Sequence, residues 1–178
     1  MDYKSIDEIY VANLAFREAL GDTISTITKE EAQVYPADEK WSIQEIVEHV
    51  SMVDEGMSRI CGKLLREAQN EGRSGGDVLI SDVFRNYTEN ADDIKLEAPE
   101  RVQPTGERSI EESTKKLDEN LAAYESLRPL FMGFDGLSAK FPHPFFGPLS
   151  AQDWLVLAGE HMRRHTRQIE KVLGKIRQ

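Results

Sequence analysis

The sequence predicts an all-α protein whose long helices pack as a four-helix bundle. Apolar residues recur with helical period over four long stretches, and each stretch is preceded by a serine that an acid follows three residues later. No run of alternating apolar and polar residues is long enough to build a sheet. Long amphipathic helices bury their apolar sides most simply against one another, which favours a bundle.

The starts of the helices are marked by serine caps. Four serine and acid pairs have the capping spacing: Ser5 with Glu8, Ser42 with Glu45, Ser109 with Glu112, and Ser150 with Asp153. The first three match the capping box, and the fourth is a weaker variant because Asp replaces Glu. The apolar patterns that follow predict helices over residues 5–28, 42–70, 109–131 and 150–176.

Each of these helices has an apolar stripe that would face the interior of the bundle. The first two stripes consist of Ile9, Phe16, Leu20, Ile24 and Ile27, and of Ile43, Ile46, Val50, Val53, Met57, Ile60 and Leu64. The other two consist of Ile110, Leu117, Leu121, Tyr124 and Leu127, and of Trp154, Ala158, His161, His165, Ile169, Val172 and Ile176. The last stripe is unusual because it contains two histidines.

Two connections between the helices are long. Residues 72–107 begin with GRSGGD and contain LISDVFRNY, for which a short helix is expected, and loops of that length in compact domains are often functional or mobile. The other connection, MGFDGLSAKFPHPFFGPLS, is aromatic and rich in Pro and Gly. We therefore expect it to form an ordered cover.

Length, composition and charge restrict the class of protein. The chain has 178 residues, of which 39% are hydrophobic, so we expect a single domain over residues 1–178 with a sizeable core. The net charge of −10 argues against nucleic acid and against an anionic membrane surface as partners, since both attract basic patches.

The expected location is the cytoplasm. The N-terminal segment lacks the features of a signal peptide, and no stretch approaches the roughly 18 apolar residues of a membrane span. The single cysteine, Cys61, excludes an internal disulfide and fits a reducing compartment. It lies near the apolar stripe of its helix, so a core position is expected rather than a nucleophilic role.

Three of the four histidines have the positions that a metal site requires. His161 and His165 are four residues apart in the last helix, so their side chains lie one above the other on its apolar face. His49 lies near the edge of the apolar stripe of the second helix, from where it can reach a shared cavity. Three neutral imidazoles with a fourth position left open are typical of a catalytic zinc-type centre.

The alternative is that these are core histidines, each satisfied by a hydrogen bond to a neighbouring group. A single buried histidine would favour that interpretation. Two stacked imidazoles are harder to explain in this way, because each carries polar nitrogen atoms that are costly to bury without a partner. The residue pattern alone leaves both interpretations open.

Two segments resemble signatures of the DinB/YfiT-like superfamily, a group of proposed metalloenzymes. WSIQEIVEHV resembles the Trp-containing segment that supplies the family's first histidine, and HPFFGPLSAQDWLVLAGEHMRRHTRQIEKVL resembles its C-terminal signature. The resemblance spans nearly the whole chain. It implies an up-down-down-up four-helix bundle with a long crossover between helices two and three. It also implies that His49, His161 and His165 bind a divalent metal ion and that the protein is a homodimer.

The resemblance also suggests a reaction. Relatives include thiol-dependent transferases and isomerases that use bacillithiol or mycothiol, which implies transfer of a low-molecular-weight thiol to an electrophile. The expected partners are then a small-molecule substrate and a thiol cosubstrate, and the expected metals are zinc or nickel, both of which imidazole suits. The alternatives are a metal-dependent hydrolase and a non-catalytic helical module that binds a metal or another ligand.

The catalytic residues stay unassigned. A hydrolase usually needs a carboxylate near the metal as general base. Glu45 is already explained as a capping residue, and Glu160 points away from the apolar stripe despite its place beside His161. Asp54 and Glu55 are expected to be solvated. The lack of a convincing base favours thiol transfer over hydrolysis.

The fourth histidine, His143, is expected to be structural, because prolines flank it in a loop and it has no ligand spacing to the others. With Phe141, Phe145 and Phe146 it could line the mouth of a pocket, since this loop leads directly into the last helix. Trp154 falls on an apolar stripe, and Trp41 precedes the cap at Ser42, where its ring can pack on the first turn of the helix. Both tryptophans are therefore expected in the core.

Overall fold

The computed structural model describes residues 3–75, 77–82 and 97–178. Within them, four long helices form the body of the fold: α1 (Ile6–Ser25), α3 (Ile43–Asn70), α5 (Ile110–Gly133) and α6 (Ala151–Ile176). The shorter elements are α2 (Lys29–Ala32), the 3₁₀ helix η1 (Glu100–Val102), and the strands β1 (Lys140–His143) and β2 (Gly147–Ser150). The predicted all-α class and four-helix bundle are confirmed.

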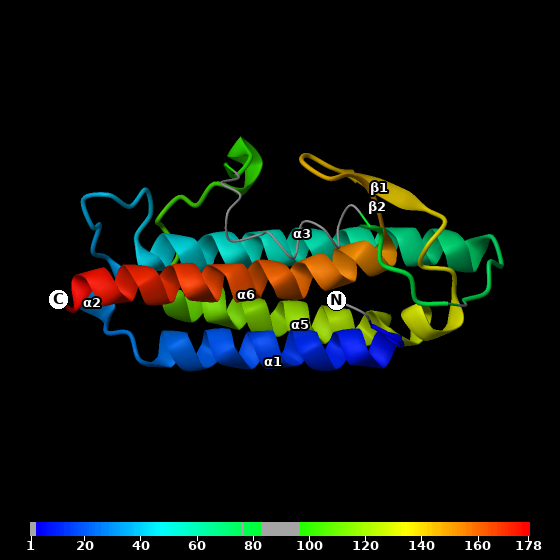
Figure 1. Ribbon diagram of the computed structural model, residues 1–178, viewed down its shortest axis with the longest axis horizontal. Coiled ribbons are helices and arrows are strands. Elements are labelled where there is room, and N and C mark those ends of the chain that lie inside the picture. The colour runs from blue at the N-terminus through cyan, green and yellow to red at the C-terminus, as the bar shows by residue number, and fades with distance from the viewer. Residues whose placement is uncertain (1–2, 76, 83–96) are drawn as a thin grey trace.

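The four long helices differ in their neighbours and in the direction in which they run. Helix α6 packs against both α1 and α3, and α3 packs against α5, whereas α1 and α5 contact each other less. Figure 1 shows that α1 and α6 run in one direction along the bundle while α3 and α5 run in the other. This is the up-down-down-up order, and it places α3 beside α6, the two helices that carry the three candidate histidines.

The connection between α3 and α5 is only partly described. Residues 83–96, which contain most of the short helix expected in LISDVFRNY, lie outside the described residues. The part before them is tied to the start of α6, because Gln152 Oε1 accepts from the backbone N–H of Leu79 and Asp153 Oδ1 accepts from that of Ser81, both at 2.9 Å. The part after them includes η1, which lies over α3 (Figure 1).

The connection between α5 and α6 is ordered, as expected, but it contains a small sheet that the sequence did not predict. Strands β1 and β2 pair antiparallel, with Phe141 opposite Leu149. Each strand has only four residues, too few to stand out as an alternating run. Leu149 is buried in the core, so the hairpin is attached to the end of the bundle from which α6 starts (Figure 1).

The serine caps begin all four long helices, but the strength of the individual caps differs from the prediction. Closed capping boxes are formed by Ser42 with Glu45, Ser109 with Glu112, and Ser150 with Asp153. At the first helix, Ser5 accepts from the Glu8 backbone N–H, but the Glu8 carboxylate accepts from the Lys4 N–H and not from that of Ser5. The predicted box at Ser5 is therefore only half formed, whereas the supposedly weaker one at Ser150 is complete.

A close contact of the Asn13 side chain joins α1 to α6. Asn13 Nδ2 of α1 donates to the carbonyl oxygen of Leu155 at 2.8 Å. The Asn13 Oδ1 atom lies directly against Gly159, where an added Cβ would clash with it. A glycine at this position therefore allows the two helices to meet closely.

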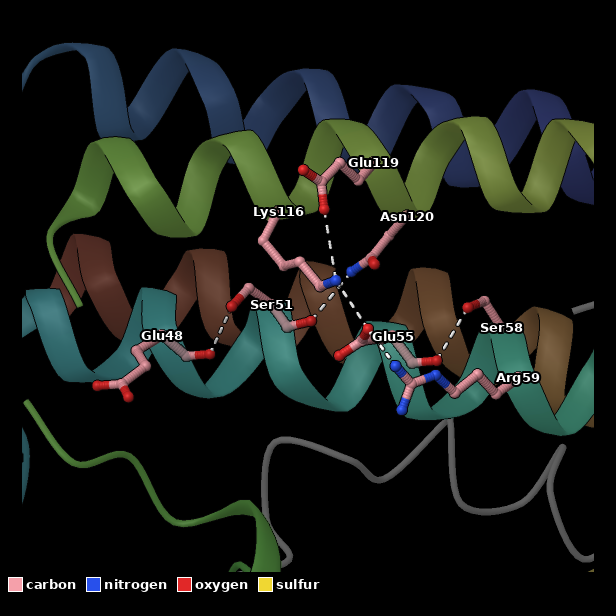
Figure 2. A network of polar contacts seen from close by, with 8 residues as sticks. All are labelled: Glu48, Ser51, Glu55, Ser58, Arg59, Lys116, Glu119 and Asn120. Atoms are coloured by element: carbon pink, nitrogen blue, oxygen red, sulfur yellow. Dashed lines mark hydrogen bonds and ion pairs between the residues drawn. The ribbon is translucent and has the colours of Figure 1, made fainter. Parts of the chain in front are cut away.

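The contact between α3 and α5 is partly polar (Figure 2). Lys116 of α5 lies between Glu55 of α3, at 2.7 Å, and Glu119 of its own helix, at 3.4 Å. Asn120 Nδ2 donates to the backbone carbonyl of Ser51 at 3.0 Å. The expectation that Asp54 is solvated is wrong: its side chain is only 1% exposed, and its carboxylate pairs with Arg17 of α1 at 3.0 Å.

The apolar core confirms the position expected for the cysteine. Cys61 is fully buried among residues such as Leu65 and Leu155, and burial raises the pKa of its thiol far above the ordinary value. A second group of core residues, which includes Val50 and Ile169, fills the bundle next to the candidate histidines. Among the described residues, none of the helices is both long enough and apolar enough to cross a membrane.

Candidate metal centre

Helices α3 and α6 bring His49, His161 and His165 together. Each residue offers one ring nitrogen, and these three atoms all lie within 4.8 Å of one another. The ring centroids are 4.3 Å apart for the two histidines of α6, and the ring of His49 lies 5.2 Å from His161 and 5.0 Å from His165. The structure thus joins the two residues of one helix to the third, as the sequence predicted.

The two histidines of α6 direct the same ring atom at each other. Their spacing of four residues stacks them on one face of the helix, and the two Nε2 atoms are 3.1 Å apart. Two nitrogen ligands of one zinc ion, each about 2.0–2.1 Å from it, are about 3.3 Å apart at the tetrahedral angle and about 2.9 Å apart at a right angle. The separation of these atoms therefore fits a shared metal ion.

The outward nitrogens of two of the rings have hydrogen-bond acceptors. His49 Nδ1 lies 2.7 Å from the carbonyl oxygen of Val102, and His165 Nδ1 lies 2.7 Å from Gln168 Oε1. Carbonyl and amide oxygens only accept hydrogen bonds, so each Nδ1 carries the hydrogen and each Nε2 keeps a free lone pair directed into the cluster. Metal-binding histidines in proteins are commonly oriented by such outer partners.

Burial keeps the three rings neutral. His49 and His165 are buried, and His161 is partly exposed. Loss of solvent lowers the pKa of His165 to about 3, and it lowers the pKa of His49 against the opposing effect of the bond to Val102. For His161, burial and the two neighbouring imidazoles hold the pKa well below its usual range. Neutral imidazole is the form that binds a metal, so the site needs no deprotonation near neutral pH.

Two groups around the site were not identified from the sequence. The Val102 acceptor is a main-chain atom from η1, and no side-chain pattern could reveal it. Gln168 was detectable in principle, because it follows His165 by three residues and therefore lies on the same face of α6. Trp41 also lies against His49, with ring centroids 4.9 Å apart, so this tryptophan covers the site as well as contacting the core.

The fourth histidine is not part of the cluster. His143 stacks on Phe146, with centroids 4.4 Å apart and nearly parallel rings, and its Nδ1 accepts from the Phe145 backbone N–H at 3.2 Å. Burial, together with the positive charge of Arg101, lowers the pKa of His143 to about 4. These contacts support the structural role expected for it. Because Arg101 belongs to η1, the same charge interaction indicates that the hairpin and η1 lie near each other (Figure 1).

The aromatic residues of the hairpin have different environments. Phe141 packs against Trp154, at 6.4 Å between centroids, and Trp154 is buried as expected. Phe145 is 46% exposed at the tip of the hairpin. Of the proposed mouth residues, Phe141 therefore contacts the core, while the tip remains accessible from solvent.

The carboxylates considered as a general base all have other partners. Glu45 closes the cap of α3, and Glu160 pairs with Arg163. Asp54 pairs with Arg17, and Glu55 pairs with Lys116. Within the described part of the chain, the cluster of possible ligands contains histidines alone.

Comparisons with known proteins found a relative and a solved structure that match along most of the chain. The chain is 26% identical over 171 residues to the uncharacterized protein YuaE of Bacillus subtilis (strain 168), and the match covers 90% of this chain and 96% of YuaE. The fold resembles the crystal structure of TT2238, a four-helix bundle protein, with a TM-score of 0.62, 23% identity, and coverage of 93% of this chain and 98% of that one. At that identity the structural likeness bears on the fold alone.

The family assignment rests on a match that covers most of the chain. The DinB superfamily pattern matches residues 14–169, a segment that begins within α1, ends within α6 and includes all three clustered histidines. The resemblance seen in the two sequence segments is thereby confirmed. The chain belongs to the DinB superfamily.

Proposed function

We propose that His49, His161 and His165 hold a divalent metal ion, zinc or nickel, and that the protein is an enzyme that transfers a low-molecular-weight thiol to an electrophile. The observation that carries the proposal is the convergence of three neutral imidazoles whose ring nitrogens lie within 4.8 Å of one another. A site with three protein ligands leaves a coordination position for a substrate, as in catalytic zinc centres. When bound, such an ion lowers the pKa of a thiol or water that coordinates it.

The donor set fits such an ion. All three donors are nitrogens of neutral rings, and zinc and nickel both accept imidazole readily. The outer bonds from His49 to Val102 and from His165 to Gln168 fix the rings in the form that presents Nε2 to the cluster. The protein would thus orient its ligands before the metal binds.

The surroundings of the cluster favour a thiol nucleophile over water. Hydrolysis usually requires a nearby base to take a proton from water. The candidate acids are held in other contacts, as with Glu160 and Arg163 or Asp54 and Arg17. A thiol loses its proton far more readily than water does, so it can react without a dedicated protein base. With an epoxide, the sulfur would form a bond to carbon, the C–O bond would open, and the oxygen would gain a proton from solvent.

The proposal can be tested by thiol consumption. Zinc- or nickel-loaded protein would be mixed with bacillithiol or mycothiol and a panel of epoxides and activated halides, and the adducts would be identified by mass spectrometry. We expect consumption that depends on the metal, is lost in the His161→Ala, His165→Ala double variant and persists in Gly174→Ala, a change at an open position of the same helix. Metal-dependent cleavage of esters without thiol would support the hydrolase alternative instead. Bound metal with neither reaction would support a binding module.

A further inference from the structure

We propose that Glu48 is a positioning residue that orients His49 through the segment formed by residues 102–106. Within the described residues, the Glu48 carboxylate bonds to Thr105 and Gly106 and not to the imidazole. The same segment supplies the Val102 carbonyl that binds His49 Nδ1. The predicted effect on metal affinity rests on the proposed function. The predicted effect on which ring nitrogen of His49 carries the hydrogen does not.

The carboxylate of Glu48 is deeply buried and well bonded. The residue is 2% exposed, and its two oxygens accept from Thr105 Oγ1 at 2.9 Å and from the Gly106 backbone N–H at 2.8 Å. Figure 2 shows this carboxylate on the side of α3 that faces away from α5, so it takes no part in the polar contact around Lys116. A buried carboxylate is costly unless it is hydrogen-bonded, and here the connecting segment provides the donors.

The segment is anchored to α3 at two places, one at Gly106 and one at Val102. Gln44, one turn before Glu48, donates from Nε2 to the Gly106 carbonyl at 2.9 Å, so the peptide groups on both sides of Gly106 are held. Gly106 has a φ of +75°, a conformation that favours glycine and that a side chain would strain. Four residues earlier, Val102 meets His49 at 2.7 Å.

In the described part of the chain, α3 is the long helix that holds residues 97–107 by hydrogen bonds. Among the described residues, the hydrogen bonds between residues 97–107 and the long helices run to α3, through Gln44, Glu48 and His49. Other hydrogen bonds of η1 and its flanks are internal, such as that from Val102 N–H to the Pro99 carbonyl. Removing the Glu48 carboxylate would therefore break two of the hydrogen bonds that hold the segment on α3 and let the Val102 carbonyl move away from His49.

The consequence for His49 is chemical as well as geometric. The Val102 carbonyl holds the hydrogen on Nδ1, which leaves the lone pair on Nε2 and directs it toward His161 and His165. Without that acceptor, the neutral ring can place its hydrogen on Nε2 and rotate. Outer partners of metal-binding histidines typically account for about 10- to 100-fold in metal affinity.

A matched control exists in the same chain. Glu160 precedes His161 just as Glu48 precedes His49, and it is also buried, with 4% exposure. Its carboxylate, however, accepts from Arg163 Nε of its own helix at 2.8 Å. Replacing Glu160 therefore removes a buried acid beside a clustered histidine without releasing the segment over His49.

The test compares Glu48→Ala and Glu48→Gln with Glu160→Ala in the full chain, using two measurements. Ring ¹⁵N chemical shifts of the metal-free proteins would report which nitrogen of His49 carries the hydrogen. Competition with a chromophoric chelator would give the zinc affinity. We expect Glu48→Ala to lose the fixed Nδ1–H form and to bind zinc about 10- to 100-fold more weakly. Glu160→Ala should retain both properties, and Glu48→Gln, which keeps one acceptor oxygen, should fall between the two.

Unchanged ring shifts and zinc affinity in Glu48→Ala would overturn the proposal, as would an equal loss in Glu160→Ala. If Glu48→Ala does not fold, Thr105→Val removes one bond of the anchor from an exposed residue, and its ring shifts decide the question. If the parent protein binds no zinc, the proposed function fails, while the ring shifts of the metal-free proteins still decide the role of Glu48.

Discussion

The Nε2 atoms of His161 and His165 lie 3.1 Å apart, although both rings are neutral. His165 uses its Nδ1 hydrogen on Gln168, so its Nε2 can only accept. In the absence of a metal, the close contact therefore requires the hydrogen of His161 to be on Nε2. Metal binding would displace this hydrogen to Nδ1, so one ligand changes tautomer while the other two are already set by their outer bonds.

Gln168 should influence metal affinity without binding the metal. In Gln168→Ala the Nδ1 hydrogen of His165 loses its acceptor, and we expect zinc affinity to fall by about 10- to 100-fold, as for other outer partners of histidine ligands. Competition with a chelator would measure it. Glu170→Ala, at an exposed position two residues further along α6, serves as the control. An equal effect in both variants would contradict the assigned role.

The buried pair of Arg17 and Asp54 should be important for stability. Removing Asp54 leaves the Arg17 guanidinium largely buried, with 13% side-chain exposure, and breaking such a pair costs about 3–5 kcal/mol. Glu55, the next residue, is 25% exposed, and its partners Lys116 and Arg59 are 27% and 75% exposed, so the loss of these solvent-accessible pairs should cost about 1 kcal/mol. Urea unfolding of Asp54→Ala and Glu55→Ala would measure both values. Similar losses in the two variants would show that the Arg17 contact is not stabilising.

A side chain at Gly159 should destabilise the protein. A Cβ at this position would clash with Asn13 Oδ1, and overpacking of this kind costs about 1–3 kcal/mol. Gly174, in the same helix, has open space around the corresponding position, so Gly174→Ala should stabilise the helix by up to about 1 kcal/mol. Thermal unfolding would compare the two variants. Addition of Asn13→Ala should restore much of the loss in Gly159→Ala, and no restoration would argue against a close contact between Asn13 and Gly159.

The metal-free protein should lose stability as the pH falls below about 6.5, the ordinary pKa of histidine. Burial lowers the pKa of His165 to about 3 and also lowers the pKa values of His49 and His161. Between pH 6.5 and the lowered pKa of each ring, the unfolded chain binds a proton that the folded state excludes. Each of the three histidines therefore lowers the free energy of unfolding by on the order of 1 kcal/mol for each pH unit that the pH falls.

Denaturation at pH 7.5, 6.0 and 5.0 would test this dependence. Above about pH 5 the carboxylates with lowered pKa values, such as Glu31 and Asp135, both at about 2, contribute little to the slope. A His165→Gln variant should show a flatter dependence than the parent. The same pH dependence in the parent and in His165→Gln would contradict the assignment of a neutral, buried ring at this position.

The helices and the histidine pair of α6 were predictable because they depend on local spacing. Ser42 and Ser109 begin their helices as expected, since a cap involves residues only three positions apart. His161 and His165 share one face for the same reason. The exception is Ser5, where the Lys4 N–H competes for the Glu8 carboxylate, a contact that the spacing rule does not include.

The features that were missed depend on partners far away in the sequence. Asp54 follows a polar pattern that suggests solvent exposure, but it is buried because Arg17 of another helix meets it. The acceptor for His49 is the main chain of Val102, 53 residues further on, and a carbonyl has no sequence signature. The residue pattern placed His49 near the edge of its helix stripe and proposed it as a third ligand. The resemblance strengthened that proposal, and the packing of α3 against α6 brings His49 to the other two histidines.

The most direct test of the central claim is the metal content of tag-free protein, measured by plasma mass spectrometry beside the His161→Ala, His165→Ala double variant and the His143→Ala control. We expect close to one equivalent of zinc or nickel in the parent and in His143→Ala, and none in the double variant with its fold retained by circular dichroism. Metal-free parent protein that takes up neither ion on incubation would contradict the claim, as would a double variant that binds as much metal as the parent.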